Sequence, residues 1–169
     1  CKNYPHQTKY TLPIPPSPNL PNMKAVYLYP ATCYFEATPV SLGRGTSLPF
    51  QVYGHPNMTG YDYSFTPKSV PGAKNPPQLN KLCHGVNLSN MSDEEIWKRG
   101  VDLSYVIDAY KNLNIGDHFF RPFFELLVGT DYVRKMIIEG KSAEEIKNRW
   151  KGDVEKFKEQ RKPYLLYQE

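Results

Sequence analysis

The chain has 169 residues, of which 40% are hydrophobic and 22% are charged, a composition typical of a globular domain that buries its own core and not of a disordered chain. Its formal net charge is +4, but the basic residues of the last third alternate with acidic ones. The sequence therefore lacks the one-sided basic stripe of a nucleic-acid-binding protein, and no nucleic-acid partner is expected. No run of about 18 apolar residues occurs, and the sequence therefore predicts no membrane span.

Residues 1–21 are rich in proline and are predicted to form an extended strap. The run Pro13-Ile14-Pro15-Pro16-Ser17-Pro18 cannot form a helix, because each proline fixes its own φ and restricts the residue before it. Such a run favours polyproline II geometry, whose stiffness sets the distance between the segments on either side. The scarcity of glycine argues against a flexible linker.

Residues 22–35 are predicted to form a helix. Asn22 is a preferred N-cap residue, and apolar residues follow it near helical spacing. Pro30 is expected to bend this helix or to end its first part. Glu36 then lies at or just beyond the helix end, where a carboxylate serves either acid–base chemistry or solubility alone.

The segment that follows, residues 37–50, places a guanidinium between two glycines. Gly43 and Gly45 flank Arg44. Glycine adopts positive φ readily and has no Cβ that would keep a ligand away from the main chain. We therefore predict a sharp bend that presents the planar guanidinium of Arg44. Such a group suits a ligand with a carboxylate or many oxygens. The alternative is a tight hairpin whose arginine lies in solvent.

Short strands are predicted over 42–53, 65–69 and 81–89, with a loop over 70–79. Between the first two strands, residues 55–64 gather ring faces and hydrogen-bonding groups, namely His55, Tyr61, Asp62 and Tyr63. Sugar-binding surfaces use rings and polar groups in this way, although tyrosines equally fill cores and interfaces. His84, in the third strand, is either catalytic or a structural histidine with satisfied hydrogen bonds.

From Ser92 onward the sequence predicts helices. Capping boxes at 92–95 and 142–145 mark helix starts, and Gly140 marks a helix end. The expected buried residues are the apolar stripes Ile96, Leu103, Ile107, Tyr110 and Leu113, then Val133 and Ile137, then Ile146, Trp150, Val154 and Phe157, together with Phe119, Phe120, Phe123 and Phe124. The predicted fold class is α+β: a small, short-stranded mixed sheet in a turn-rich N-terminal half, packed by a C-terminal group of helices.

Several blocks, in this order, resemble the C-terminal half of the bacterial NamZ-type exo-β-N-acetylmuramidases, once catalogued as a domain of unknown function. They are Leu12 to Pro21, Tyr29 to Glu36, Gly43-Arg44-Gly45-Thr46, Pro49-Phe50, Cys83-His84-Gly85-Val86, Gly129-Thr130, and Arg161 to Tyr167. One position departs from the family pattern. Ala37 stands where the family usually has glycine, so a backbone shape that requires positive φ is not carried over there.

The resemblance implies the domain organisation and the activity. Residues 1–21 would be the strap that follows a Rossmann-like N-terminal domain, and 22–169 the C-terminal α+β domain. The intact protein would release terminal N-acetylmuramic acid from peptidoglycan fragments in the periplasm or outside the cell. This chain alone, which begins without a signal-peptide pattern, would be inactive.

The same resemblance implies an active site in a cleft between the two domains. This chain would supply one wall, with Glu36 as a catalytic carboxylate and Arg44 as the anchor of the lactyl carboxylate. Ser41 and Thr46 would donate hydroxyls on the Gly43 and Gly45 bend, and Tyr61 and His84 would complete substrate binding. Glycoside hydrolysis usually needs two carboxyl groups, and only Glu36, Asp62 and Asp117 lie in turn-rich contexts.

Two other functions stay open, a stand-alone carbohydrate-binding module and a protein-interaction domain. No cofactor and no metal are expected, because the cysteines lack zinc spacing and no Gly-rich phosphate loop opens a helix. A disulfide between Cys33 and Cys83 would persist outside the cytoplasm, which the resemblance favours, and two separate buried thiols are the alternative.

Overall fold

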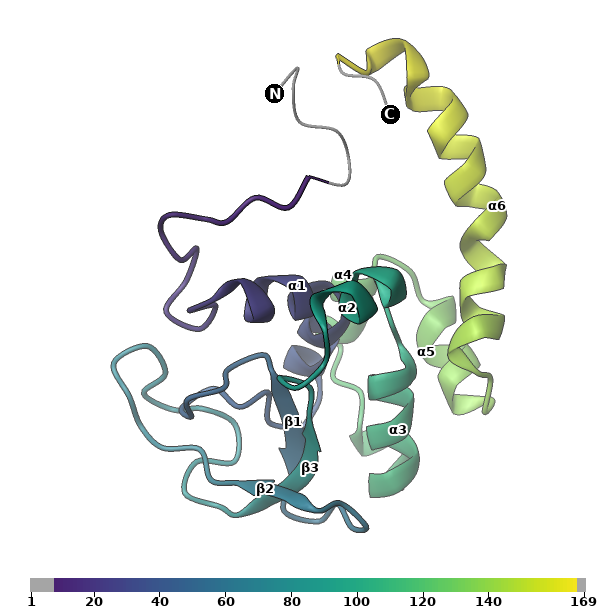
Figure 1. Cartoon of the computed structure of the whole chain (residues 1–169). Coiled ribbons are helices and arrows are strands. Elements are labelled where there is room, and N and C mark those ends of the chain that lie inside the picture. The colour runs from purple at the N-terminus through teal and green to yellow at the C-terminus, as the bar shows by residue number, and fades with distance from the viewer. Residues whose placement is uncertain (1–7, 167–169) are drawn as a thin grey trace.

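The computed structural model describes residues 8–166, which form a body of helices beside one small sheet (Figure 1). The α-helices are α1 (Met23–Thr32), α2 (Asp93–Arg99), α3 (Ser104–Leu113), α4 (Phe123–Val128), α5 (Tyr132–Ile138) and α6 (Ala143–Arg161). The strands are β1 (Val52–His55), β2 (Tyr63–Phe65) and β3 (Cys83–Asn87), and short 3-10 helices η1 (Cys33–Ala37), η2 (Gly116–His118) and η3 (Lys162–Tyr164) complete the fold. The predicted α+β class is confirmed.

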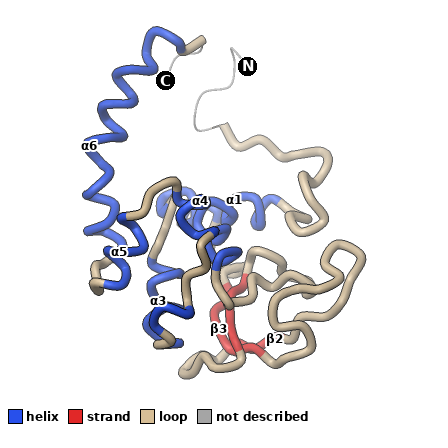
Figure 2. The backbone as a smooth tube through the Cα atoms, turned by 180° about the vertical axis from the view of Figure 1, so that it is seen from behind, coloured by secondary structure: helices blue, strands red, loops and turns tan. Residues whose placement is uncertain are grey.

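The sheet is antiparallel throughout and not mixed. Its strand order is β1-β3-β2, so β3 pairs with both neighbours. The first strand is also much shorter than the predicted 42–53, because positive φ at Gly43, Gly45 and Phe50 turns the chain before it can extend. The sheet and its loops form the end of the body opposite the free end of α6 (Figure 2).

Helix α1 begins where the sequence predicts. The side chain of Asn22 accepts a hydrogen bond from the backbone N–H of Ala25 at 2.9 Å and so caps the helix. Pro30 lies inside α1, and the chain tightens into η1 soon after it, at Cys33. This tightening carries Glu36 onto a 3-10 turn and away from the α-helical register that the sequence suggested.

One core joins α1, η1 and the later helices. Its largest fully buried side chains include Phe35, Phe119, Phe124, Leu28 and Met58. Of the predicted phenylalanine cluster, Phe123 is exposed, because it lies on the outer face of α4. A smaller cluster of Val52, Phe65 and Cys83 fills the other face of the sheet.

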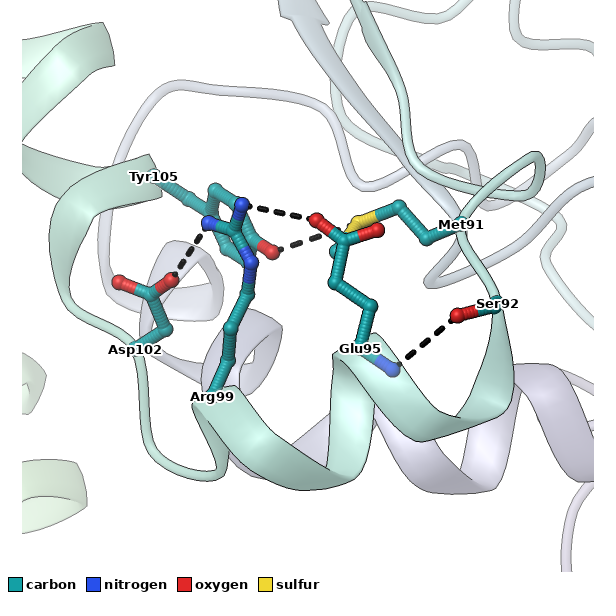
Figure 3. A network of polar contacts seen from close by, with 6 residues as sticks. All are labelled: Met91, Ser92, Glu95, Arg99, Asp102 and Tyr105. Atoms are coloured by element: carbon teal, nitrogen blue, oxygen red, sulfur yellow. Dashed lines mark hydrogen bonds and ion pairs between the residues drawn. The ribbon is translucent and has the colours of Figure 1, made fainter.

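A polar network fixes the corner between α2 and α3 (Figure 3). The Arg99 guanidinium donates to Glu95 at 2.9 Å and to Asp102 at 3.1 Å. The Ser92 hydroxyl accepts from the Glu95 N–H at 3.1 Å, but the Glu95 carboxylate turns to Arg99 and does not return to Ser92. The capping box predicted at 92–95 is therefore only half formed, whereas the one at Ser142 is complete.

Two segments rise from the same side of the body, the described part of the strap and the end of α6 (Figures 1 and 2). Residues 8–21 contain no helix or strand, as their prolines require, and residues 1–7 of the strap lie outside the described residues. The prediction that the whole α6 stripe packs as scaffold is wrong. Ile146 is buried, but Val154 and Phe157 are 43% and 59% exposed, because α6 continues beyond the elements that cover its first half.

Candidate functional site

The bend around Arg44 is built by close backbone packing. Gly43 and Gly45 have φ of +70° and +82°, and a Cβ on Gly45 would lie 2.2 Å from the carbonyl oxygen of Lys68. The space beside these glycines is thus filled by the protein's own chain, and not left open to a ligand. In the structure, Gly45 lets the bend pack against Lys68 and Pro76, and Gly43 lets it pack against Leu48 and Val52.

The two predicted hydroxyl donors serve the same bend. Ser41 is fully buried, and its Oγ accepts from the N–H of Gly43 at 3.3 Å. The Thr46 hydroxyl donates to the Gly43 carbonyl at 2.7 Å and accepts from the N–H of Leu48 at 3.0 Å. Both side chains therefore shape the turn that holds Arg44.

The bend brings Arg44 to Glu36. An Nη of Arg44 lies 3.4 Å from Oε1 of Glu36, and the two side chains are 37% and 26% exposed. This separation is long for a charge-assisted hydrogen bond. The Nε of Arg44 is buried and has no hydrogen-bond partner within residues 8–166. The guanidinium is therefore only partly satisfied, and it keeps donor capacity on a half-exposed surface.

Two aromatic rings complete this cluster, which we call the Arg44 cluster (Tyr29, Glu36, Arg44 and Phe50). The Arg44 guanidinium lies 6.0 Å from the centre of the Phe50 ring, and the Tyr29 and Phe50 rings are 5.2 Å apart. Partial burial, followed by the charge of Glu36, raises the pKa of the Tyr29 hydroxyl, which therefore stays protonated.

Phe50 is held in a conformation that few bulky residues adopt. Its φ is +58°, which costs about 1–2 kcal/mol for a residue other than glycine. A backbone hydrogen bond of 2.8 Å from the Phe50 N–H to the Leu42 carbonyl helps to hold the turn. Strain of this kind often occurs at functional sites, and here it fixes the ring beneath the Arg44 guanidinium.

The remaining predicted site residues lie in other contacts. The Tyr61 hydroxyl donates to Asp108 Oδ2 at 2.7 Å, and the Tyr53 hydroxyl donates to the same oxygen at 2.8 Å. His84 lies on β3, opposite His55 on one side and Ser64 on the other. No described contact joins Tyr61 or His84 to Glu36 or Arg44.

No described contact joins the other two candidate carboxylates to the Arg44 cluster. Asp62 is exposed beside Tyr61. Asp117 lines a cavity of about 320 Å³ together with Arg121, Glu125 and Arg134, among others. A second cavity of about 320 Å³ is mainly apolar and lies between α5, α6 and the residues Tyr34 and Val101. Arg44 and Glu36 line neither cavity, so the pair sits on a surface of the domain.

Sequence reasoning missed three residues of these contacts. Tyr29 falls within the predicted helix over 22–35 and Phe50 within the predicted strand over 42–53, and no pattern singles out Asp108. The proline and glycine around Phe50 were the available signal for an unusual backbone there. Nothing in the sequence pairs Asp108 with tyrosines 47 and 55 residues away.

The two cysteines within residues 8–166 are free thiols in different places. Cys33 begins η1 and Cys83 begins β3, so the disulfide alternative is not formed. Burial raises the pKa of each thiol to about 11. Within residues 8–166, no three His, Cys, Asp or Glu side chains are placed so that they could hold a metal ion, and no helix there is long and apolar enough to cross a membrane.

Comparisons with known proteins agree on one family. A model described as the C-terminal part of the exo-beta-N-acetylmuramidase NamZ matches residues 27–167. The peptidoglycan beta-N-acetylmuramidase NamZ of Bacillus subtilis (strain 168) is 34% identical over 167 residues, which cover 90% of this chain and 40% of that protein.

Two crystal structures of DUF1343 family proteins from Bacteroides fragilis NCTC 9343 are also similar. One has a TM-score of 0.97 at 82% identity, and the match covers 99% of this chain and 48% of that chain. The other has a TM-score of 0.63 at 20% identity, with coverages of 92% and 45%, and shows likeness of fold alone. The chain spans less than half the length of each of these relatives.

Proposed function

This chain belongs to the family of NamZ C-terminal domains, and from that premise we propose that it forms one wall of the active-site cleft of a peptidoglycan exo-β-N-acetylmuramidase. The other wall would be the preceding Rossmann-like half, which would also hold the principal catalytic acid. The intact enzyme would release terminal N-acetylmuramic acid from muramyl disaccharides outside the cytoplasm. This chain alone would be inactive.

The observation that carries the proposal is the incomplete pairing of Arg44. One Nη of its guanidinium lies 3.4 Å from Glu36, which is long for a charge-assisted hydrogen bond, and its side chain is still 37% exposed, so its Nη groups keep donors for a ligand. N-acetylmuramic acid differs from N-acetylglucosamine by a lactyl carboxylate, and a planar guanidinium binds a carboxylate in two parallel hydrogen bonds. The same surface offers the Tyr29 ring, which suits the apolar face of a pyranose.

Glu36 has two roles consistent with this geometry. It lies beside the anchor, where a carboxylate would reach the glycosidic bond or a water next to it. It also holds the Arg44 guanidinium in place, which is a positioning role. The two roles differ in kinetics, because loss of an acid or base lowers kcat, whereas loss of a positioning contact chiefly raises KM.

The test is Glu36→Gln in the intact enzyme. Acid–base work by Glu36 predicts a fall in kcat of at least about a hundredfold. Glu125→Gln is the matched control, because Glu125 also pairs with an arginine, Arg134, at 2.7 Å and is similarly exposed. A fall of less than about fivefold in Glu36→Gln, equal to that of the control, would remove Glu36 from the chemistry.

A further inference from the structure

The stripe of α6 changes its surroundings halfway along the helix. Ile146 is fully buried, Trp150 is half-buried, and Val154 and Phe157 are 43% and 59% exposed. These residues follow one another at intervals of three and four, so they lie on one face of the helix. The stripe that packs in the core therefore continues into solvent on the same face.

The exposed half of α6 has little to hold it in this chain. Its polar face carries short-range ion pairs, such as Lys158 with Glu155 at 2.8 Å, and pairs of this kind contribute only about 0.2–0.5 kcal/mol each. A helical segment this short is marginal in water without a packed apolar face. Covering Val154 and Phe157 would supply the missing packing.

More apolar side chains are exposed on the two segments that rise on this side of the body (Figures 1 and 2). On the strap, Leu12 and Ile14 are 37% and 77% exposed, and after α6, Tyr164 and Leu166 are 82% and 87% exposed. Large apolar side chains exposed at several points on one side of a soluble domain are typical of a surface that another part of the protein covers.

We propose that the outer half of α6 and the strap form the docking surface for the preceding half of the intact protein, with Phe157 and Val154 as its apolar anchors. Two observations favour the preceding half as the part that covers this surface. The relatives extend well beyond this chain, which covers 40% and 48% of their lengths. The strap, through which a preceding half would be attached, rises on the same side of the body as α6 (Figure 2).

The family match supports the same occupant, because it runs to residue 167 and so includes all of α6 and η3. The exposed stripe of α6 thus lies within the domain that the members of this family have in common. The proposal rests on family membership and on the exposed surface. It does not depend on the roles of Arg44 and Glu36.

The test compares two double variants in the intact protein. Val154→Ser with Phe157→Ser removes the anchors, and Lys156→Ser with Glu159→Ser introduces serine on the charged face of the same turns. Hydrogen exchange is then followed at the amides of residues 153–164. If the surface is docked, these amides should exchange at least about tenfold faster in the anchor variant than in the unmodified protein, and the control variant should exchange at nearly the unmodified rate.

Small-angle scattering supplies a second readout, because release of the docking surface would increase the radius of gyration of the anchor variant alone. Equal exchange in the anchor variant and the control would overturn the proposal. So would protection that disappears on dilution together with a dimeric mass by light scattering, since a second copy would then be the occupant. Neither readout depends on activity, so failure here leaves the proposed function standing.

Discussion

At the scale of single residues, the site depends on how tightly the Arg44 bend is packed. Gly45 has φ of +82°, and a Cβ there would lie 2.2 Å from the carbonyl oxygen of Lys68 and 2.9 Å from Pro76. The sequence predicted the bend from its two glycines. It could not predict what fills the space beside Gly45, because Lys68 and Pro76 are distant in sequence and reach the bend only through tertiary packing.

The first prediction concerns this close approach. Gly45→Ala should lower the free energy of unfolding by more than about 2 kcal/mol, because alanine adds both a strained φ and a clash with main chain. Gly60→Ala is the matched control, with φ of +80° but open space around it, and should cost about 1 kcal/mol. Urea unfolding of both variants makes the comparison, and equal costs would contradict the packing described.

A second residue-scale prediction follows from Cys33. Burial and the charge of Glu36 raise the pKa of its thiol from 9.0 to about 11, so the folded protein keeps a proton that the unfolded chain loses first. The free energy of unfolding should therefore fall as pH rises between 9 and about 11. Cys33→Ala should reduce that slope in a series of urea titrations, and an unchanged slope would be inconsistent with a buried thiol.

At the scale of elements, local signals were predictable and distant packing was not. Asn22 and Ser142 mark helix starts because each side chain bonds to a backbone N–H only three residues away. The α6 stripe was predicted to be buried along its whole length, yet Phe157 is exposed. A 3.6-residue period identifies an apolar face, but it does not say whether the covering element belongs to the same domain.

The cap of α1 gives an element-scale prediction, because α1 leads into the turn that positions Glu36. Asn22→Ala should lower the free energy of unfolding by about 1 kcal/mol, the usual contribution of an N-cap. Asn22→Ser keeps a side-chain oxygen and should restore most of that loss. Denaturant titrations of the two variants test this, and equal stabilities would show that the hydrogen bond to Ala25 contributes nothing.

At the scale of the whole molecule, we assign two sets of residues to contact with the preceding half. One is the Arg44 cluster, where the Phe50 ring, attached to a backbone with positive φ, lies beneath a partly satisfied guanidinium. The other is the apolar stripe of α6 and the strap, on the side where we place the preceding half. Family membership was predictable from the blocks around Glu36 and Arg44, whereas the separation of Tyr61 and His84 from that pair required the fold.

The proposed recognition of the lactyl carboxylate by Arg44 is tested most directly by substrate discrimination in the intact enzyme. Arg44→Ala should reduce the ratio of kcat/KM for N-acetylmuramic over N-acetylglucosamine glycosides by about 10- to 150-fold, equivalent to about 1.5–3 kcal/mol of charge-assisted hydrogen bonding. Arg134→Ala removes a similarly exposed, ion-paired arginine and should leave the ratio unchanged. An Arg44→Ala enzyme that discriminates as well as the unmodified one would contradict the account.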